Sequence, residues 1–186
     1  MKIAVFCGSK TGNNPVFMQA ARSLGSLFAK SDIELVYGGA QVGLMGAIAD
    51  ASLEGGGRVT GVMPKALVEK EIEHKGLTEL IITDDMHGRK QTMADIADGF
   101  IAMPGGAGTL EEIYEQWTWA QLGIHKKACA FLNINGFYDP VRVMAQQSAK
   151  AGFMKQHHAD MLIFSSDPDD LIQQIHAYSA PEQKWQ

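Results

Sequence analysis

The residues best suited to bind a ligand or take part in a reaction lie in one stretch, between positions 98 and 122. Within it, the apolar run Phe100–Met103 is bounded by a glycine and a proline, which is typical of a buried strand. The next segment, Pro104–Gly108, ends the strand and contains three glycines that permit positive φ angles. From Thr109 onward, apolar residues recur at helical spacing. The sequence therefore predicts a strand that delivers a glycine-rich loop to the N-terminus of a helix.

A loop of this kind can bind an anion. Glycines let a ligand approach the backbone, and the free N–H groups and the dipole of the helix favour negative charge. Thr109 adds a hydroxyl group, which we expect at the helix cap. We name Gly105–Thr109 the glycine cradle and expect it to bind a phosphate group.

Two better-known phosphate-binding loops fit this stretch poorly. Gly106 and Gly108 begin a G-x-G-x-x-G dinucleotide pattern, but Glu111 stands where the third glycine would allow close packing of helix and strand. The G-x-x-x-x-G-K-[ST] pattern of a P-loop is absent from the whole sequence. An NAD(P)-linked oxidoreductase is therefore the weaker interpretation.

The adjacent carboxylates Glu111 and Glu112 fall in the expected first turn of the helix. Residues there can simply complement the helix dipole. A carboxylate beside a bound phosphate, however, weakens the binding of that phosphate, because like charges repel. Two carboxylates at this place therefore indicate chemistry near the phosphate as well as binding.

A cation is needed among these negative groups, and the segment Met86–Lys90 offers two. Arg89 has a planar fork that can hold a phosphate or ribose oxygen with two hydrogen bonds. Lys90 is either a solvated neighbour or a second phosphate contact.

Composition limits the classes of protein that this chain can belong to. The 186 residues, 46% of them hydrophobic, predict one domain. Together with the glycine cradle, this gives a single nucleotide-binding domain expected over residues 1–178 and a frayed tail over residues 179–186. The net charge of −5 argues against a nucleic-acid partner and against an anionic membrane surface. Cys7 and Cys129 lie in apolar runs and are expected to be core thiols. Because we find no signal peptide or membrane span, we expect a cytoplasmic protein.

Strands and helices are expected to alternate along the chain. Continuous apolar runs predict buried strands, and apolar residues at helical spacing predict helices between them. The expected strands lie at 3–6, 34–37, 59–62, 80–82, 100–103, 128–132 and 161–164. Helices are expected at 15–30, 86–97, 109–122, 139–149 and 168–177, and a further helix is expected to follow the second glycine-rich turn and to end at residue 53. Residues 65–76 are expected to form a short helix and an exposed loop. This pattern predicts an α/β fold, a Rossmann-like doubly wound parallel sheet with helices on both faces.

Three glycine-rich turns follow expected strands, at Gly8, Gly38 and Gly105. The carboxyl ends of parallel strands share one edge, where ligands bind near the switch in strand order. We therefore expect the three turns to line one nucleotide-sized crevice. Methionines are ordinary core residues by default, but two of them could pack on an adenine here. The further candidate crevice residues are Gly8, Ser9, Gly39, Met45 and Met86.

Two separate strings, Pro104–Glu112 and Met86-x-x-Arg89-Lys90, resemble motifs of the LONELY GUY (LOG) family of cytokinin riboside 5′-monophosphate phosphoribohydrolases. Cys7-Gly8-Ser9, Gly38–Gly46 and Trp119–Lys126 look like the same family, so the resemblance covers about residues 2–175. It implies hydrolysis of the N-glycosidic bond of an adenosine-type 5′-monophosphate, which releases the free base and ribose 5-phosphate. It also implies that the enzyme uses no metal or other cofactor, and that it is a homodimer with its site near the interface.

Members of this family have often been labelled lysine decarboxylases. The sequence gives no support to that label, because a pyridoxal enzyme needs a Schiff-base lysine and a phosphate cup for the cofactor.

The resemblance also carries roles over to single residues. Arg89 and Glu112 match the catalytic arginine and glutamate of the family. Glu79 is placed only by its distance from the arginine motif. The substrate contacts that the resemblance implies are Glu79, Arg89, Lys90, Gly105, Gly106, Ala107, Gly108, Thr109, Leu110, Glu111 and Thr118.

The residue types support a matching physical account. Glycosidic cleavage passes through an oxocarbenium-like state, which a carboxylate near the anomeric carbon stabilises while it positions or deprotonates water. We expect Glu112 in that role and Arg89 as the group that orients the ribose and phosphate. The alternative is a regulatory protein that binds a mononucleotide without turnover, but such a protein gains nothing from Glu112. Whether the substrate is prenylated or plain AMP stays open.

Overall fold

The computed structural model describes residues 1–69 and 72–181. Among them, seven strands form one parallel sheet in the order β4-β3-β2-β1-β5-β6-β7. The strands are β1 (Lys2–Phe6), β2 (Glu34–Tyr37), β3 (Val59–Pro64), β4 (Glu79–Thr83), β5 (Gly99–Ala102), β6 (Ala128–Leu132) and β7 (Leu162–Ser165). The predicted doubly wound α/β fold is thus confirmed.

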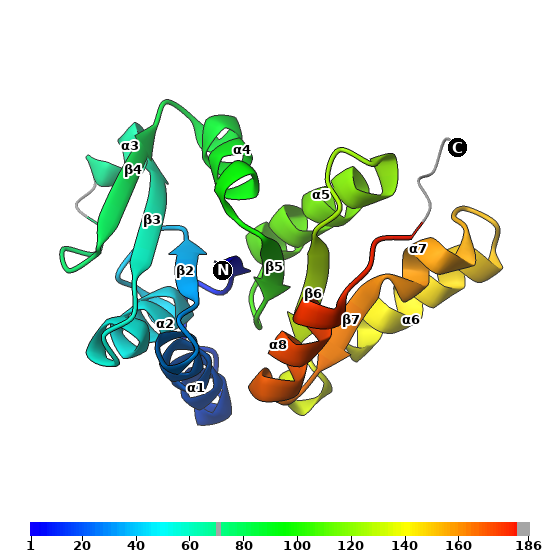
Figure 1. Cartoon of the computed structure of the whole chain (residues 1–186), viewed down its shortest axis with the longest axis horizontal. Coiled ribbons are helices and arrows are strands. Elements are labelled where there is room, and N and C mark those ends of the chain that lie inside the picture. Colours follow the sequence, from blue (N-terminus) through cyan, green and yellow to red (C-terminus); the bar gives the residue numbers. More distant parts are fainter. Residues whose placement is uncertain (70–71, 182–186) are drawn as a thin grey trace.

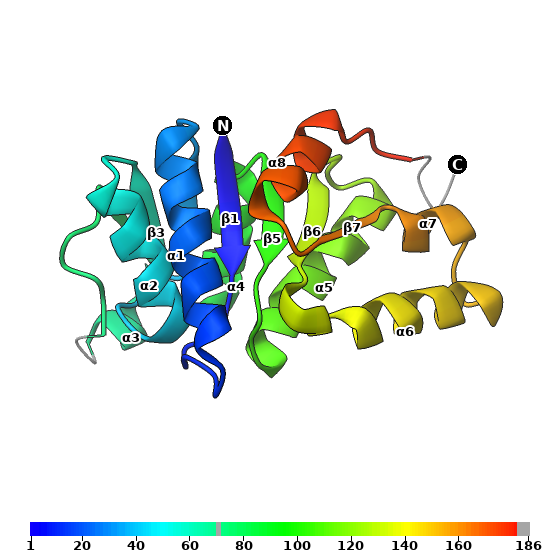
Figure 2. The same ribbon diagram turned by 90° about the horizontal axis from the view of Figure 1, so that it is seen from below.

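Helices cover both faces of this sheet. Figures 1 and 2 show α1, α2 and α8 on one face and α4 and α5 on the other. The helices are α1 (Pro15–Lys30), α2 (Gly43–Glu54), α3 (Lys65–Val68), α4 (Met86–Ile96), α5 (Ala107–Leu122), α6 (Asp139–Lys150), α7 (Gln156–Asp160) and α8 (Pro168–Ala177), with a 3₁₀ turn at Ile134–Gly136. None of the helices in the described ranges is both long and apolar enough to cross a membrane.

Local capping signals set where several helices begin. Asn14 accepts a hydrogen bond from the backbone N–H of Val16, and a proline occupies the first turn of α1. Asp85 caps α4 through the N–H of Gly88, at 2.8 Å. Asp167 caps α8 in the same way. These predicted starts are confirmed.

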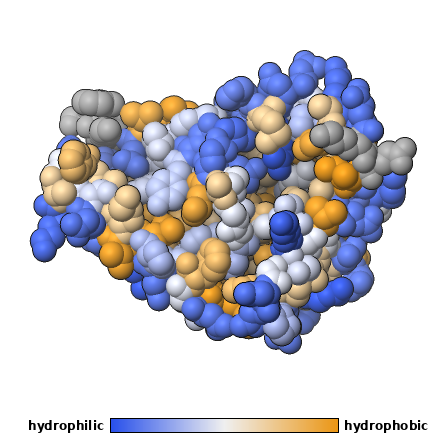
Figure 3. Space-filling model, turned by 180° about the vertical axis from the view of Figure 1, so that it is seen from behind, coloured by the Kyte–Doolittle hydropathy of each residue, from blue (hydrophilic) through white to orange (hydrophobic). Residues whose placement is uncertain are grey.

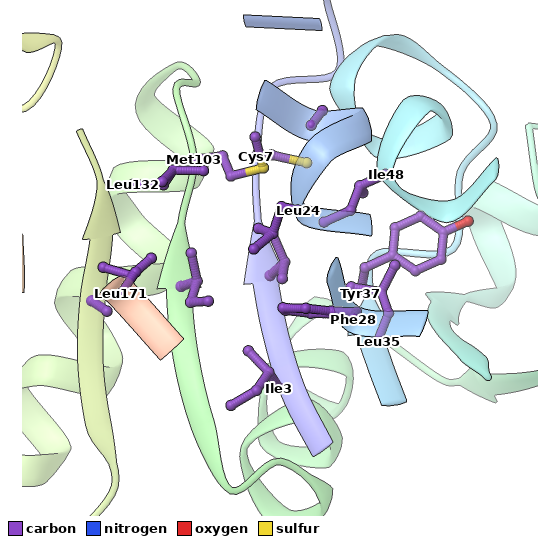
Figure 4. Packing of buried hydrophobic residues seen from close by; sticks show 14 of the residues in the cluster. Ile3, Cys7, Leu24, Phe28, Leu35, Tyr37, Ile48, Met103, Leu132 and Leu171 are labelled. Carbon is purple, nitrogen blue, oxygen red and sulfur yellow. The ribbon is translucent and has the colours of Figure 1, made fainter. Parts of the chain in front are cut away.

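The core consists of two apolar layers, one on each face of the sheet. Figure 4 shows Leu24 and Phe28 of α1 and Ile48 of α2 packed over the first two strands. The other layer joins the opposite side of the sheet to α4 and α5 through residues such as Met93 and Ile113. Because both faces are covered, the central strands are continuous apolar runs.

Some predicted boundaries were wrong. α5 begins at Ala107 rather than at Thr109, and β7 is shifted by one residue. The short helix α7 was not predicted, because its five residues contain no apolar repeat. In the supposedly exposed segment 65–76, His74 is buried. Of the predicted tail, residues 182–186 lie outside the described part of the chain, as do residues 70 and 71 of that segment.

The strand order places a switch point at the centre of the sheet. From β1, the chain moves outward through β2 to β4, and then returns to β5 on the other side of β1. The loops that follow β1 and β5 therefore diverge, which opens space at the carboxyl edge. The first glycine-rich turn and the glycine cradle are these two loops.

Candidate active site

The three glycine-rich turns meet at this edge, as predicted. The N–H of Gly8 donates to the carbonyl of Pro104 at 3.1 Å, which ties the first turn to the cradle. The N–H of Leu44 donates to the carbonyl of Gly8 at 3.1 Å, which ties the second turn to the first. Gly43 has φ +55°, and a Cβ there would lie less than 3.0 Å from the backbone of Ser9. The glycines therefore let three backbones pack together.

Within the cradle, the glycines permit positive φ angles, but none of the three adopts one. A Cβ on Gly105 would lie less than 3.0 Å from Thr109 Oγ1, so this glycine is needed for packing. A Cβ on Gly106 or Gly108 would meet nothing within 4 Å. These two positions face open space beside the start of α5, where a ligand can approach the backbone.

The predicted cap was also wrong. Gly106 is the N-cap of α5 and makes no side-chain cap bond, whereas Thr109 is buried inside the helix. Since α5 starts at Ala107, Glu111 and Glu112 are its fifth and sixth residues, and the first turn contains no acidic residue. The effect of a helix dipole fades beyond the first turn. Complementing the dipole therefore explains these carboxylates poorly.

A pocket of about 400 Å³ lies at the switch point, next to the cradle. Its volume is within the range of sites for small ligands. It is lined by Gly8, Ser9, Lys10, Thr11, Gly12, Phe17, Leu44, Pro104, Gly105, Gly106 and Phe137. The first turn and the cradle thus form its walls, whereas the second turn and its helix contribute only Leu44.

The predicted catalytic residues form an ion pair behind the cradle. Arg89 Nη1 on α4 lies 3.2 Å from Glu112 Oε1 on α5. Each residue is only 9% exposed. Neither of them lines the pocket.

Several contacts hold the guanidinium of Arg89 in place. Its Nε donates to the carbonyl of Val62 at 3.1 Å, at the end of β3. A Cβ on Gly38 would lie less than 3.0 Å from its Nη2 and 3.3 Å from Met45 Sδ. Met86 Sδ lies 3.9 Å from its Nη1. Arg89 therefore connects the second glycine-rich turn to α5.

The surroundings of Glu112 raise the pKa of its carboxyl group. Burial raises the pKa of Glu112; the nearby charge of Arg89 opposes this shift, and the net direction is upward. Cys7, which precedes Gly8, feels both charges: burial and then Glu112 raise the pKa of its thiol, whereas Arg89 lowers it. Figure 4 shows Cys7 beside Met103, at the ends of β1 and β5. The ion pair thus lies close to the switch point.

Lys90 is neither solvated nor free for a ligand. Its Nζ donates to Glu111 Oε1 and, at 3.1 Å, to Glu115 Oε1, and its side chain is 9% exposed. Burial alone would lower the pKa of Lys90, but these two hydrogen bonds outweigh it and raise the pKa. Glu115 was not predicted. Its position four residues after Glu111 on one helix face is the signal that indicates it.

Of the remaining candidate site residues, some lie at the pocket or the start of α5, and others lie away from the cradle. Gly8 and Ser9 line the pocket, and Leu110 is half-buried at the start of α5. Glu79 is the first residue of β4 and is exposed, so it lies at the amino edge of the sheet. The structure therefore does not bring Glu79 to the cradle, which lies at the carboxyl edge. Thr118 is exposed, and its hydroxyl donates to the carbonyl of Tyr114, further along α5.

The two methionines and Gly39 complete the candidate set. Met86, a candidate crevice residue, is 43% exposed at the start of α4. Met45 is partly buried beside the guanidinium of Arg89. The carbonyl of Gly39 accepts a hydrogen bond from the N–H of His74 at 2.8 Å. Met45 and Met86 thus flank Arg89 on two sides.

His74 was missed by sequence analysis. Its Nε2 lies 2.8 Å from Asp50 Oδ1 on α2, and its Nδ1 accepts a hydrogen bond from the N–H of Gly76. This tautomer is therefore Nε2-protonated, with Nε2–H donating to the carboxylate. Together with the bond to Gly39, it fixes the second turn. No local pattern indicates such a role, because it depends on a contact 24 residues away.

Comparison with known proteins identifies the family of this chain. A family model described as "Possible lysine decarboxylase" matches residues 45–175. The probable cytokinin riboside 5′-monophosphate phosphoribohydrolase of Oryza sativa subsp. japonica is 44% identical, with 100% of this chain and 86% of that protein covered. The cytokinin riboside 5′-monophosphate phosphoribohydrolase of Rhodococcoides fascians is 43% identical, with 93% and 88% covered. A relative of the same name from Arabidopsis thaliana is 42% identical, with 95% and 82% covered.

Solved structures that resemble this fold are more distant in sequence. The molybdenum cofactor carrier protein of Chlamydomonas reinhardtii has a TM-score of 0.72 and 21% identity, with 95% of this chain and 98% of that chain covered. The molybdenum cofactor binding protein of Rippkaea orientalis has a TM-score of 0.71 and 21% identity, with 95% of both chains covered. At this identity the likeness establishes the fold alone. The sequence relatives go further: the chain belongs to the LONELY GUY family, the family of the cytokinin riboside 5′-monophosphate phosphoribohydrolases.

Proposed function

We propose that this protein hydrolyses the N-glycosidic bond of adenosine-type 5′-monophosphates and releases the free base and ribose 5-phosphate. The observation that carries the proposal is the buried pair of Arg89 and Glu112, 3.2 Å apart beside the glycine cradle. A buried ion pair adds little net stability, because desolvation of both charges offsets their attraction. A buried carboxylate with a raised pKa, three residues beyond the glycine cradle, supports a role in chemistry instead.

In the proposed reaction, the cradle binds the 5′-phosphate through the N–H groups at the start of α5. This remote binding energy holds the anomeric carbon in place. Glu112 stabilises the positive charge that develops on the ribose and orients the attacking water. Arg89 aligns the phosphoribosyl group and keeps Glu112 ionised.

The bond changes balance with one water molecule. The water oxygen bonds to C1′ as the C1′–N9 bond breaks, and the electron pair of that bond goes to the base. Glu112 accepts a proton from the water, and the departing base gains a proton from solvent. Glu112 then releases its proton to solvent, which regenerates the carboxylate.

Cytokinin-type monophosphates are the substrates that we favour. Relatives 42–44% identical to this chain are named cytokinin riboside 5′-monophosphate phosphoribohydrolases. Met45 and Met86, which flank Arg89, are flexible apolar side chains that suit an N6 substituent on the adenine.

Lysine decarboxylation fits the site less well. A Schiff-base lysine reacts as the neutral amine, so its pKa must be low. The hydrogen bonds to Glu111 and Glu115 instead raise the pKa of Lys90, the lysine nearest to the ion pair in sequence.

We further infer that the working unit is a homodimer. Thr118 lies eleven residues beyond the start of α5, about 16 Å along the helix at 1.5 Å per residue, so one nucleotide in the cradle does not reach it within a chain. A second copy against α5 would complete the site. Leu122 and Ile124 at the end of α5 are exposed, and Figure 3 shows several groups of hydrophobic residues at the surface of the back face. Light scattering should give about twice the 20.2 kDa of one chain, whereas an active monomer would contradict the dimer.

We also place the protein in the cytoplasm. Cys7 and Cys129 are both free and buried, which suits a reducing compartment.

To test the proposed activity, the protein is incubated with AMP or with adenosine, and the adenine released from each is separated by chromatography and measured. We expect adenine from AMP and little from adenosine, because the nucleoside lacks the phosphate that the cradle binds. Tight binding of AMP with no adenine formed would favour a regulatory binding protein. Comparable kcat/KM values on AMP and adenosine would contradict the assigned role of the cradle.

A further inference from the structure

The charges around the cradle do not provide a counter-charge for a phosphate. Arg89 is paired with Glu112, and Lys90 is paired with both Glu111 and Glu115. These two cations and three carboxylates sum to a formal charge of −1. The residues Gly105–Thr109 are uncharged, and the chain as a whole has a net charge of −5.

The expected ligand has the same sign as this surrounding. A phosphate monoester carries a charge of about −1.5 to −2 at pH 7. Backbone N–H groups and the dipole at the start of α5 offset only part of it. A further cation on the pocket side of the cradle would therefore strengthen phosphate binding.

Lys10 is such a cation. It lines the same pocket as Gly105 and Gly106 of the cradle. In the part of the chain that the structure describes, no carboxylate forms an ion pair with Lys10. Its ammonium can therefore bind a ligand without giving up an ion pair, whereas Arg89 and Lys90 on α4 each hold a carboxylate.

The backbone of Lys10 is held while its side chain stays exposed. A Cβ on Gly43 would lie 2.5 Å from the N of Lys10, and a Cβ on Gly8 would lie 3.2 Å from its O. The first and second glycine-rich turns thus fix the position of the Lys10 backbone. A side chain on a fixed backbone and beside a pocket loses less freedom when it binds a ligand.

We propose that Lys10, which lines the same pocket as Gly105 and Gly106, binds the 5′-phosphate of the substrate. It would complete the glycine cradle with the charge that the cradle lacks, and would thereby select monophosphates over nucleosides. This inference rests on the proposed function, since it assigns a further residue to the same phosphate site.

The test compares three variants of the full-length protein. Lys10→Gln removes the charge, and Lys10→Arg keeps it. Lys30→Gln is the matched control, because Lys30 is also exposed but lies at the far end of α1. For each protein, KM and kcat on AMP, kcat/KM on adenosine, and competitive inhibition by inorganic phosphate are measured.

We expect Lys10→Gln to raise KM for AMP about tenfold or more, the usual effect of losing a charged hydrogen bond, and to weaken inhibition by phosphate similarly. The values for kcat and for adenosine should change little. Lys10→Arg and Lys30→Gln should resemble the wild type. An unchanged KM and unchanged phosphate inhibition in Lys10→Gln would overturn the assignment.

Failure of the inference and failure of the proposed function can be told apart. If the wild-type protein releases no base from any 5′-monophosphate, the proposed reaction is wrong. Calorimetric titration with AMP then decides the role of Lys10 without turnover. Weaker binding by Lys10→Gln than by Lys30→Gln supports the role, and equal binding refutes it.

Discussion

The guanidinium of Arg89 rests against the Cα of Gly38, so closely that a Cβ at position 38 would lie less than 3.0 Å from Nη2. Gly38 has no positive φ, so an alanine there is allowed by the backbone. The glycine is therefore required by the arginine beside it. This relationship connects a residue with no functional group to the position of the side chain that we propose to be catalytic.

Gly38→Ala should consequently impair catalysis more than stability. The new methyl group displaces the flexible end of Arg89 from Glu112 and from the carbonyl of Val62. Misplacing a catalytic group by about 1 Å can lower the rate about a hundredfold, so we expect kcat/KM on AMP to fall ten- to hundredfold. Gly88→Ala is the control, since a Cβ there meets Asp85 Oδ1 at an ordinary 3.4 Å. Equal activity of the two variants would show that Arg89 does not depend on Gly38.

Gly106→Ala should affect the ligand and leave the free protein intact. A Cβ at this position meets nothing within 4 Å, and the φ of −94° suits alanine. The methyl group would occupy the space beside the N–H groups of α5, so KM for AMP should rise severalfold. The melting temperature should fall by only about 2–4 °C, because alanine is a poorer N-cap residue than glycine by about 1 kcal/mol. A normal KM in this variant would place the phosphate elsewhere.

The pH dependence should report the raised pKa of Glu112. Its carboxylate is the active form, so kcat/KM should fall as pH drops through a pKa above the ordinary 4.5. Arg89 lowers this pKa, and Arg89→Ala should therefore move the acid limb of its residual activity to higher pH. The same upward shift means that the folded state loses stability, relative to the unfolded state, as pH rises from about 4.5 through the raised pKa. An acid limb that Arg89→Ala leaves in place would point to another titrating group.

The fold could be predicted from the sequence because its signals are local. Each central strand is an uninterrupted apolar run, and Asn14, Asp85 and Asp167 cap helices by contacts within three residues. The doubly wound order then brings the first turn and the cradle together without further information.

The site could be predicted only in part, because its details depend on contacts across the fold. Threonine is a favourable N-cap, yet α5 starts two residues earlier and Thr109 is buried beneath Gly105. Spacing before the arginine motif suggested Glu79, but that residue begins its strand and therefore lies at the wrong edge. Burial of the ion pair also has no local signal: it follows from the approach of α4 to α5.

That burial changes what substitution of the pair should do to stability. Glu112→Gln leaves Arg89 without its counter-charge, so we expect a loss of about 1–3 kcal/mol in the free energy of unfolding. The fold should survive, because the amide still offers an acceptor and Val62 still accepts from Arg89. Combining Glu112→Gln with Arg89→Ala should lower kcat scarcely more than the worse single variant, since the two residues act as a unit. Multiplicative losses would show that they act independently.

The most direct measurement is the product balance of the wild-type protein and Glu112→Gln on isopentenyladenosine 5′-monophosphate. We predict that the wild type releases free base and ribose 5-phosphate in equal amounts. Folded Glu112→Gln should do so at least about a hundredfold more slowly, because the charge that stabilises the oxocarbenium-like state is gone. Nucleoside and inorganic phosphate as products, or wild-type turnover by folded Glu112→Gln, would contradict the account.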